Sequence, residues 1–173
     1  MERPGQSISK SGQTPSQFAA ANSLGLPASD AITKAMNPLV ADAFALYVKT
    51  KNYHWHVSGP SFRDYHLLFD EQAEQIFAMI DPLAERVRKL GGTTIRSVGE
   101  IQKQTAVADD NDASVEPREM IGRLLEDNRR FADALRKAHD VCEKYKDVAS
   151  TSVLEIFLDE TERRIWFLNS VIV

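Results

Sequence analysis

The chain has 173 residues, of which 43% are hydrophobic and 27% are charged, so we expect a globular domain with a substantial core. Its net charge of −4 argues against a protein that coats nucleic acid through bulk electrostatics. The single cysteine, Cys142, excludes an internal disulfide and a cysteine-only zinc site. No apolar run is long enough to span a membrane and no signal-peptide pattern opens the chain, so we expect a cytoplasmic protein.

The beginning of the chain is predicted to be a flexible tail. Residues 1–29 are rich in Ser, Gln, Gly and Pro, with at most a short ordered piece over residues 18–24. Ser29 or Asp30 is expected to cap the first helix, so that the folded domain occupies residues 30–173.

The domain is predicted to contain four long helices and no strand. Apolar residues recur at three- and four-residue steps in four stretches, which cover about residues 30–57, 61–90, 117–146 and 152–173. A Ser-Gly-Pro turn separates the first two helices, and Gly91-Gly92 ends the second. A polar connection over residues 93–115, with a short helix near 97–102, is long enough to cross the bundle. The pattern therefore predicts an all-α four-helix bundle with a long crossover between helices two and three.

Two histidines are placed symmetrically about the first turn. His54 lies six residues before Pro60 and His66 lies six residues after it, so the two side chains come level in an antiparallel helix pair. Imidazoles that face each other suit a transition-metal ion. The alternative, that each is only a polar residue near the end of the bundle, stays open on this pattern alone.

The second helix also carries an acidic stripe beside its apolar one. At 100° per residue, the members of this stripe share one face. They are His66, Asp70, Glu74, Asp81 and Glu85. A solvated face usually mixes in lysine or arginine, whereas uncompensated carboxylates repel one another until a cation binds.

These groups cannot all bind one ion within one chain. His66 and Asp81 are 15 residues apart, which is about 22 Å along a helix, whereas metal–ligand distances are about 2 Å. Two antiparallel copies of the helix solve the problem, because the pairings of 66 with 85 and of 70 with 81 share one midpoint. A two-fold axis at that midpoint predicts two identical sites, each also reached by His54 and each suited to iron, with zinc or manganese as competitors.

Asp81 has an alternative role as a helix cap. Asp81-Pro82 has the pattern of an N-cap followed by the first residue of a restarted helix. Glu85 would then lie one position beyond the capping box. Capping therefore explains Asp81 but not Glu85, and it is compatible with metal binding.

The run NYHWHVSGPSFRDYHLLFDEQAEQIFAMIDPLAERVRKLGG closely resembles the signature of Dps proteins, the DNA-protection-during-starvation branch of the ferritin superfamily. The closing segment RIWFLNS resembles the last helix of that family, and the similarity covers about residues 30–173. The matching parts of the signature are the pair His54-Trp55, the G-x-x-F turn at 59–62, His66, Asp70, the D-x-x-A-E-R motif at 81–86 and Gly91-Gly92.

The resemblance implies a hollow, ferritin-like dodecamer with a ferroxidase centre at each two-fold interface. It implies that iron is bound by His54, His66 and Asp70 of one chain with Asp81 and Glu85 of another. It also implies that Fe(II) is oxidised, preferably by hydrogen peroxide, and that the ferric product is stored in the shell, which protects DNA. Trp55 would take up stray oxidising equivalents; the alternative is plain aromatic packing.

The resemblance to Dps proteins also argues against direct DNA binding. DNA-binding Dps proteins often carry a lysine-rich tail, whereas the first 29 residues here hold only Arg3 and Lys10 against Glu2. The competing hypothesis is a nucleoid-associated, DNA-compacting protein in which iron oxidation is secondary, and a third is a helical shell without catalysis.

The sequence also leads to expectations for three further residues and one segment. His56 is expected to point away from the metal site, and His139 to be structural or exposed. Asp147 is expected either to sit near a pore or, more simply, to be a solvated loop residue. The acids over residues 109–112 are expected to form a solvated loop.

Overall fold

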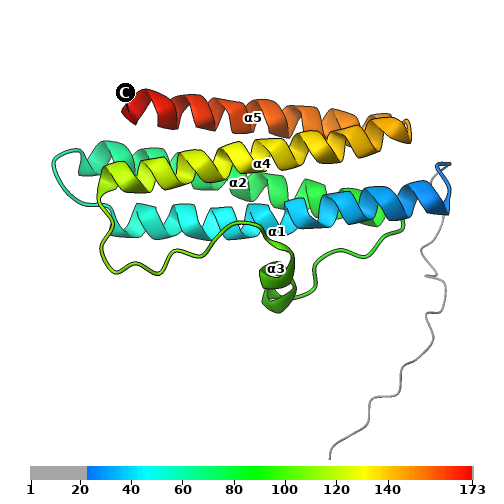
Figure 1. Cartoon of the computed structure of the whole chain (residues 1–173), viewed down its shortest axis with the longest axis horizontal. Helices are drawn as coiled ribbons and strands as arrows, with labels where there is room; N and C mark the ends of the chain where they lie inside the picture. Colours follow the sequence, from blue (N-terminus) through cyan, green and yellow to red (C-terminus); the bar gives the residue numbers. More distant parts are fainter. Residues whose placement is uncertain (1–22, 173) are drawn as a thin grey trace, which may run out of the picture.

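The computed structural model describes residues 23–172, so residues 1–22 of the predicted tail lie outside it. The predicted end of the tail at residue 29 is wrong, because residues 26–29 already belong to the first helix. The helices are α1 (Leu26–His56), α2 (Phe62–Lys89), α3 (Val98–Gln104), α4 (Pro117–Lys144) and α5 (Val148–Ile172). Figure 1 shows the four long helices lying side by side, with α3 set apart on the connection between α2 and α4. The predicted four-helix bundle with its crossover is confirmed, and none of the described residues forms a strand.

α1 begins earlier than its predicted cap. Gly25, in a left-handed conformation, precedes the helix and Pro27 lies in its first turn, where the missing N–H costs nothing. Ser29 is therefore a buried residue inside the helix, not the N-cap that the sequence suggested. The helix therefore begins at a proline and without a side-chain cap, whereas the prediction relied on a capping serine or aspartate.

α2 continues without a break through Asp81 and Pro82, so the predicted helix restart is wrong. Proline inside a helix costs about 3 kcal/mol. The neighbouring side chains offset this cost, because Ile80, Leu83 and Val87 are all buried in the core. Asp81 is consequently an exposed mid-helix carboxylate, with no capping role to explain its presence.

The end of α2 depends on its two glycines. The N–H of Gly92 donates to the carbonyl of Val87 at 3.0 Å and that of Gly91 to Arg88 at 2.9 Å, the two bonds of a Schellman motif. Gly91 adopts the left-handed conformation that this motif requires. A Cβ at Gly92 would lie 2.2 Å from Oγ1 of Thr33, so only glycine lets α1 and this turn approach so closely.

The core is a single cluster between the four long helices. Helix α1 packs on α2, α4 packs on α5, and α1 also packs on α4. The residues of α4 that the sequence placed inward are all buried, namely Ile121, Leu124, Leu125, Phe131, Leu135 and Cys142. No helix of the described residues is long and apolar enough to cross a bilayer.

Polar contacts tie the crossover to the bundle, so residues 109–112 are not simply a solvated loop. The side chain of Asp110 is only 3% exposed, and it accepts hydrogen bonds from the Tyr53 hydroxyl and the Arg123 guanidinium. Burial raises the pKa of Asp110, but these two donors outweigh it and lower that pKa to about 2. Lys49 adds a hydrogen bond to the carbonyl of Ala108 at 3.1 Å.

Asp147 is also not the solvated loop residue that the sequence suggested. It is buried, receives a hydrogen bond from Arg86 at 2.8 Å and accepts another from the backbone N–H of Ser150 at 3.2 Å. Burial raises the pKa of Asp147, but the donors from Ser150 and Arg86 outweigh it and keep the pKa below its usual value. The carboxylate therefore caps α5 and fastens it to α2.

Replacing Asp110 by Ala is expected to lower the free energy of unfolding by about 1–3 kcal/mol, because a buried hydrogen-bonded acceptor is removed. Since the folded-state pKa of about 2 lies below the unfolded value of about 3.9, the stabilisation is complete above the unfolded value. It is lost as the pH falls toward the folded one. Urea unfolding followed by circular dichroism at pH 7 and pH 3 checks both statements. Asp109→Ala, at the exposed neighbour, is the matched control; an equal loss in both variants would contradict the assignment.

Candidate metal centre

The turn between α1 and α2 brings His54 and His66 face to face, as the sequence predicted. Their rings stack with centroids 3.8 Å apart and planes inclined by 23°. His54 lies in the last turn of α1 and is buried, whereas His66 lies in the second turn of α2 and is half-buried. The antiparallel hairpin alone fixes this pairing, because both side chains project from helix ends that the short turn holds level.

Each ring is clamped by the backbone of the other residue. Nδ1 of His54 lies 2.8 Å from the carbonyl oxygen of His66, and Nδ1 of His66 lies 2.8 Å from the carbonyl oxygen of His54. A carbonyl only accepts, so Nδ1 of each ring is the donor, and in the neutral imidazole the lone pair is then on Nε2. This is the outer hydrogen bond that orients metal-binding histidines in general.

Asp70 lies one helical turn beyond His66 and completes the set. Its Oδ1 is 3.7 Å from Nε2 of His54 and 2.6 Å from Nζ of Lys51. The hydrogen bond from Lys51 is the main reason that the pKa of Asp70 lies below its usual value, with further attraction from His54. Asp70 is therefore an ionised oxygen donor beside two nitrogen donors, although Lys51 competes with a metal ion for it.

The three groups do not make a closed site within one chain. Among residues 23–172, only His139, Asp140 and Glu143 place three ligand atoms all within 4.8 Å of one another. The ligand atoms of His54, His66 and Asp70 do not all lie that close together. Three donors would also leave an ion with coordination positions for other ligands.

Asp81 and Glu85 lie farther along α2 and are exposed. Since α2 is one continuous helix, the separation of His66 and Asp81 is about 22 Å and the two cannot share an ion within a chain. The predicted lack of counter-charges along the stripe is wrong at two positions, because Asp70 pairs with Lys51 and Glu85 pairs with Lys89 at 2.9 Å. The Lys89 pair is exposed at both ends, so it holds Glu85 only weakly.

Large apolar side chains are exposed on α1 and α2 beside these groups. Trp55 is 63% exposed and Phe77 is 57% exposed, and Phe62 and Leu67 are exposed as well. Phe62, Leu67 and Phe77 lie on the side of α2 that carries His66, Asp70, Asp81 and Glu85. Trp55 is therefore not packed inside its own chain, and the exposed patch is typical of a surface that another protein covers.

The buried guanidinium of Arg164 argues against a second metal centre in the part of the bundle interior around it. This guanidinium is 1% exposed and donates to Asn128 at 2.9 Å and to Thr161 at 2.8 Å, without a carboxylate partner in the described part of the chain. Burial lowers the pKa of Arg164 to about 10, which still leaves it charged at neutral pH. In di-iron four-helix bundles, inward-facing Glu and His residues form the centre. A buried cation at this position repels a metal ion.

A cavity of about 1070 Å³ lies between α1, α3 and the crossover. Its walls include Phe44, Val48, Tyr53 and Asp110, but none of the six predicted site residues. The cavity is therefore separate from the candidate metal centre.

The family model of the ferritin-like domain matches residues 33–173 of the chain. Individual relatives indicate the branch of this family. A DNA protection during starvation protein of Brevibacillus brevis is 30% identical over 78% of this chain and 90% of its own length. The chain belongs to the Dps branch of the ferritin-like family. An uncharacterised low temperature-induced protein of Nostoc sp. is 35% identical to this Dps-family chain over 82% of the chain and 79% of its own length. The structure of DpsC from Streptomyces coelicolor superposes with a TM-score of 0.84 at 28% identity, covering 87% of this chain and 88% of that one.

Sequence analysis of this Dps-family chain did not single out Lys51, which pairs with the predicted ligand Asp70. Lys51 lies three residues before His54, so both occupy one face of α1, and this i, i+3 spacing was the available signal. His56 is exposed and its Nδ1 bonds to the carbonyl of Asn52 at 2.7 Å, which confirms that it points away from the candidate centre.

Replacing Lys51 by Met is expected to strengthen divalent-metal binding several-fold, because Asp70 loses its competing ammonium group while the buried methylene stem is retained. Calorimetric titration with Co²⁺ measures the dissociation constant in both proteins. Lys89→Met, which frees Glu85 from a fully exposed and weak pair, is the matched control and is expected to change affinity much less. Unchanged or weaker binding in Lys51→Met would contradict the competition.

Proposed function

We propose that this protein is a ferroxidase that oxidises Fe(II), with hydrogen peroxide as the preferred oxidant, and stores the ferric product inside a dodecameric shell. One observation carries the proposal. Nδ1 of His54 and of His66 is held by the other residue's backbone carbonyl, which leaves both Nε2 atoms available as metal ligands beside the ionised Asp70, in a set that is open to further ligands. Iron is the substrate of this site, and mixed imidazole and carboxylate ligands with open positions suit it.

The missing ligands are proposed to be Asp81 and Glu85 of a second copy. A two-fold axis between two antiparallel α2 helices brings residue 85 of one chain to His66 of the other and residue 81 to Asp70. Three observations support this arrangement: both carboxylates are exposed, no capping role accounts for Asp81, and apolar side chains are exposed on the same side of α2. A dimer interface would bury that apolar patch.

The side chains divide the chemistry between them. The neutral imidazoles hold the ferrous ion, while the anionic oxygens of Asp70, Asp81 and Glu85 favour the ferric state and therefore lower the cost of electron loss. One peroxide accepts two electrons, one from each of two ferrous ions, and its O–O bond breaks to give two oxygens at the water level. The ferric product then hydrolyses and releases protons. No protein side chain has to be oxidised in this balance.

Trp55 is proposed to scavenge stray oxidising equivalents near the centre. It follows His54 directly in sequence and its ring is 63% exposed in the single chain. The proposed dimer would place an easily oxidised indole close to the reacting ions.

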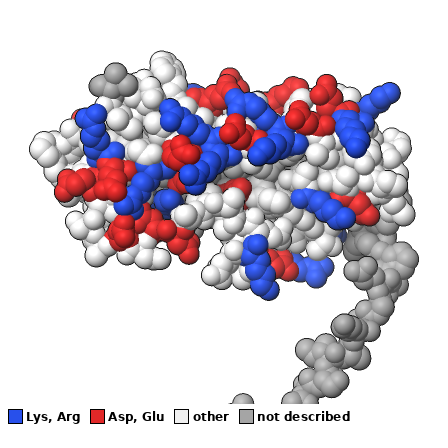
Figure 2. Space-filling view, in the orientation of Figure 1, with Lys and Arg blue, Asp and Glu red and all other residues white. Residues whose placement is uncertain are grey.

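Protection of DNA is proposed to follow from removal of Fe(II) and peroxide, not from coating the DNA. The Brevibacillus brevis relative is called a DNA protection during starvation protein. In Figure 2, lysine and arginine side chains on the viewed face are interleaved with aspartate and glutamate. Basic groups of α4 are also paired with acids, as Arg130 is with Glu126 and Arg136 with Glu162. The face shown in Figure 2 therefore offers no uninterrupted basic track for phosphates.

Asp81→Ala and Glu85→Ala are each expected to slow Fe(II) oxidation by peroxide at least tenfold, because each removes an anionic ligand. Stopped-flow absorbance of the ferric product gives the rates. Glu71→Ala, an exposed carboxylate on the same helix, is the matched control and should leave the rate unchanged. Unchanged rates in both test variants would remove the catalytic assignment.

Mixed assemblies test whether the site is shared between chains. Subunits with His54→Ala and His66→Ala are unfolded and reassembled with equal amounts of subunits carrying Asp81→Ala and Glu85→Ala. Each mixed dimer then has one intact site and one doubly defective site. Random pairing should therefore restore about a quarter of the wild-type rate from two inactive parents. An inactive mixture of correct size by light scattering would contradict the shared site.

The assembled protein is expected not to shift duplex DNA in a gel at about 200 mM salt. Any shift at low salt should disappear as salt is added, since phosphate contacts exchange with counterions. A shift that persists at the higher salt would instead favour the DNA-compacting alternative.

A further inference from the structure

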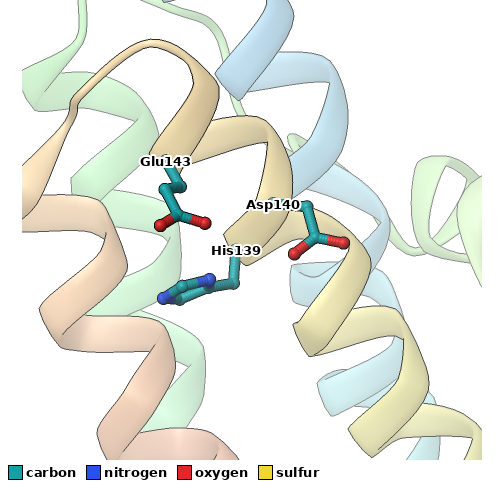
Figure 3. A group of neighbouring side chains, drawn as sticks. All are labelled: His139, Asp140 and Glu143. Atoms are coloured by element: carbon teal, nitrogen blue, oxygen red, sulfur yellow. The ribbon is translucent and has the colours of Figure 1, made fainter.

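A second group of metal-ligating side chains lies near the end of α4. His139, Asp140 and Glu143 each offer one ligand atom, and these atoms all lie within 4.8 Å of one another. Figure 3 shows the carboxylate of Glu143 on one side of the His139 ring and that of Asp140 on the other. Along the bundle, this group and His54 lie toward opposite ends, because α1 ends where α4 begins (Figure 1).

The His139 ring is oriented by a carboxylate from another helix. Its Nε2 lies 3.1 Å from Oε1 of Glu155 on α5. An ionised carboxylate only accepts, so Nε2 is the donor in this contact, and in the neutral imidazole the lone pair is then on Nδ1. A histidine whose outer N–H donates to a carboxylate is the arrangement that typically fixes the tautomer of a metal ligand. From the sequence, His139 was expected to be structural or exposed, and its contact with Glu155 on α5 was not predicted.

Asp140 and Glu143 lie near the C-terminal end of α4, where carboxylates are unfavourable. The C-terminal end of a helix carries partial negative charge, which stabilises cations and destabilises carboxylates in its last turn. Glu143 lies in the last turn of α4 and Asp140 in the turn before it, yet within residues 23–172 neither carboxylate forms an ion pair or a side-chain hydrogen bond. By contrast, the acids earlier on α4 have basic partners, as Glu126 has Arg130 and Asp133 has Arg136.

We propose that His139, Asp140 and Glu143 bind one divalent transition-metal ion per subunit, with Glu155 as the outer carboxylate that positions His139. One nitrogen and two carboxylate oxygens, with open positions for water, suit zinc or ferrous iron better than calcium or magnesium, which prefer oxygen alone. The helix end and the two unpaired carboxylates attract the ion, and the imidazole selects a transition metal. This site is independent of the proposed ferroxidase centre, since it shares no residue with it.

The site is tested with Zn²⁺ on the full chain in a His54→Ala/His66→Ala background, which removes the nitrogen ligands of the other centre. Calorimetry is expected to show one Zn²⁺ per subunit, and anomalous diffraction from a soaked crystal is expected to show a peak between His139, Asp140 and Glu143. Adding His139→Ala should remove both signals. Adding Glu155→Ala should weaken binding about 10–100-fold and leave the stoichiometry unchanged.

The controls separate loss of the site from loss of the fold. Glu143→Gln keeps the shape of the side chain and should still lower affinity at least tenfold, whereas Glu126→Gln on the same helix should not change it. Each variant must elute at the same size and keep its helical circular dichroism. The proposal fails if saturating Zn²⁺ leaves no peak at the cluster, or if His139→Ala binds as much metal as its parent. Either result leaves the ferroxidase proposal untouched.

Discussion

The reciprocal hydrogen bonds between His54 and His66 are the constraint on which the rest of the candidate centre depends. Each imidazole satisfies a backbone carbonyl of the opposite helix, so the same two bonds close the α1–α2 hairpin and set both tautomers. The backbone carbonyl of each histidine orients the ring of the other, so any change in the turn between the helices would disturb both ligands together.

The charged side chains favour a metal ion at the surface of the subunit over one inside the bundle. A buried guanidinium at Arg164 fills part of the interior, while the carboxylates of Asp70, Asp81 and Glu85 line an outer face of α2. Apolar side chains on the same face remain uncovered in the single chain. In the proposed two-fold dimer, one contact between subunits would both complete the ligand set and cover the apolar patch.

The crossover is held more firmly than its composition suggests. Asp110 joins Tyr53 of α1 to Arg123 of α4, and Asp42 accepts a hydrogen bond from the backbone of Ala106 at 2.6 Å. Burial raises the pKa of Asp42 above its ordinary value, against the hydrogen bonds that Ala106 and Thr105 donate. A polar segment therefore behaves as part of the bundle, because buried carboxylates require partners and the backbone and side chains near them supply these.

The sequence by itself determined the helix pattern, the turn that makes His54 and His66 level, and the face shared by Asp70, Asp81 and Glu85. These follow from the 3.6-residue period and from glycine and proline at the turns, which are local properties of the chain. The tertiary structure alone decided the partners of Asp110 and Asp147, the competition of Lys51 for Asp70, the passage of α2 through Pro82 and the contact of His139 with Glu155. Each of these depends on side chains from different elements, or on core packing strong enough to override a local signal, and no spacing along the chain encodes such distances.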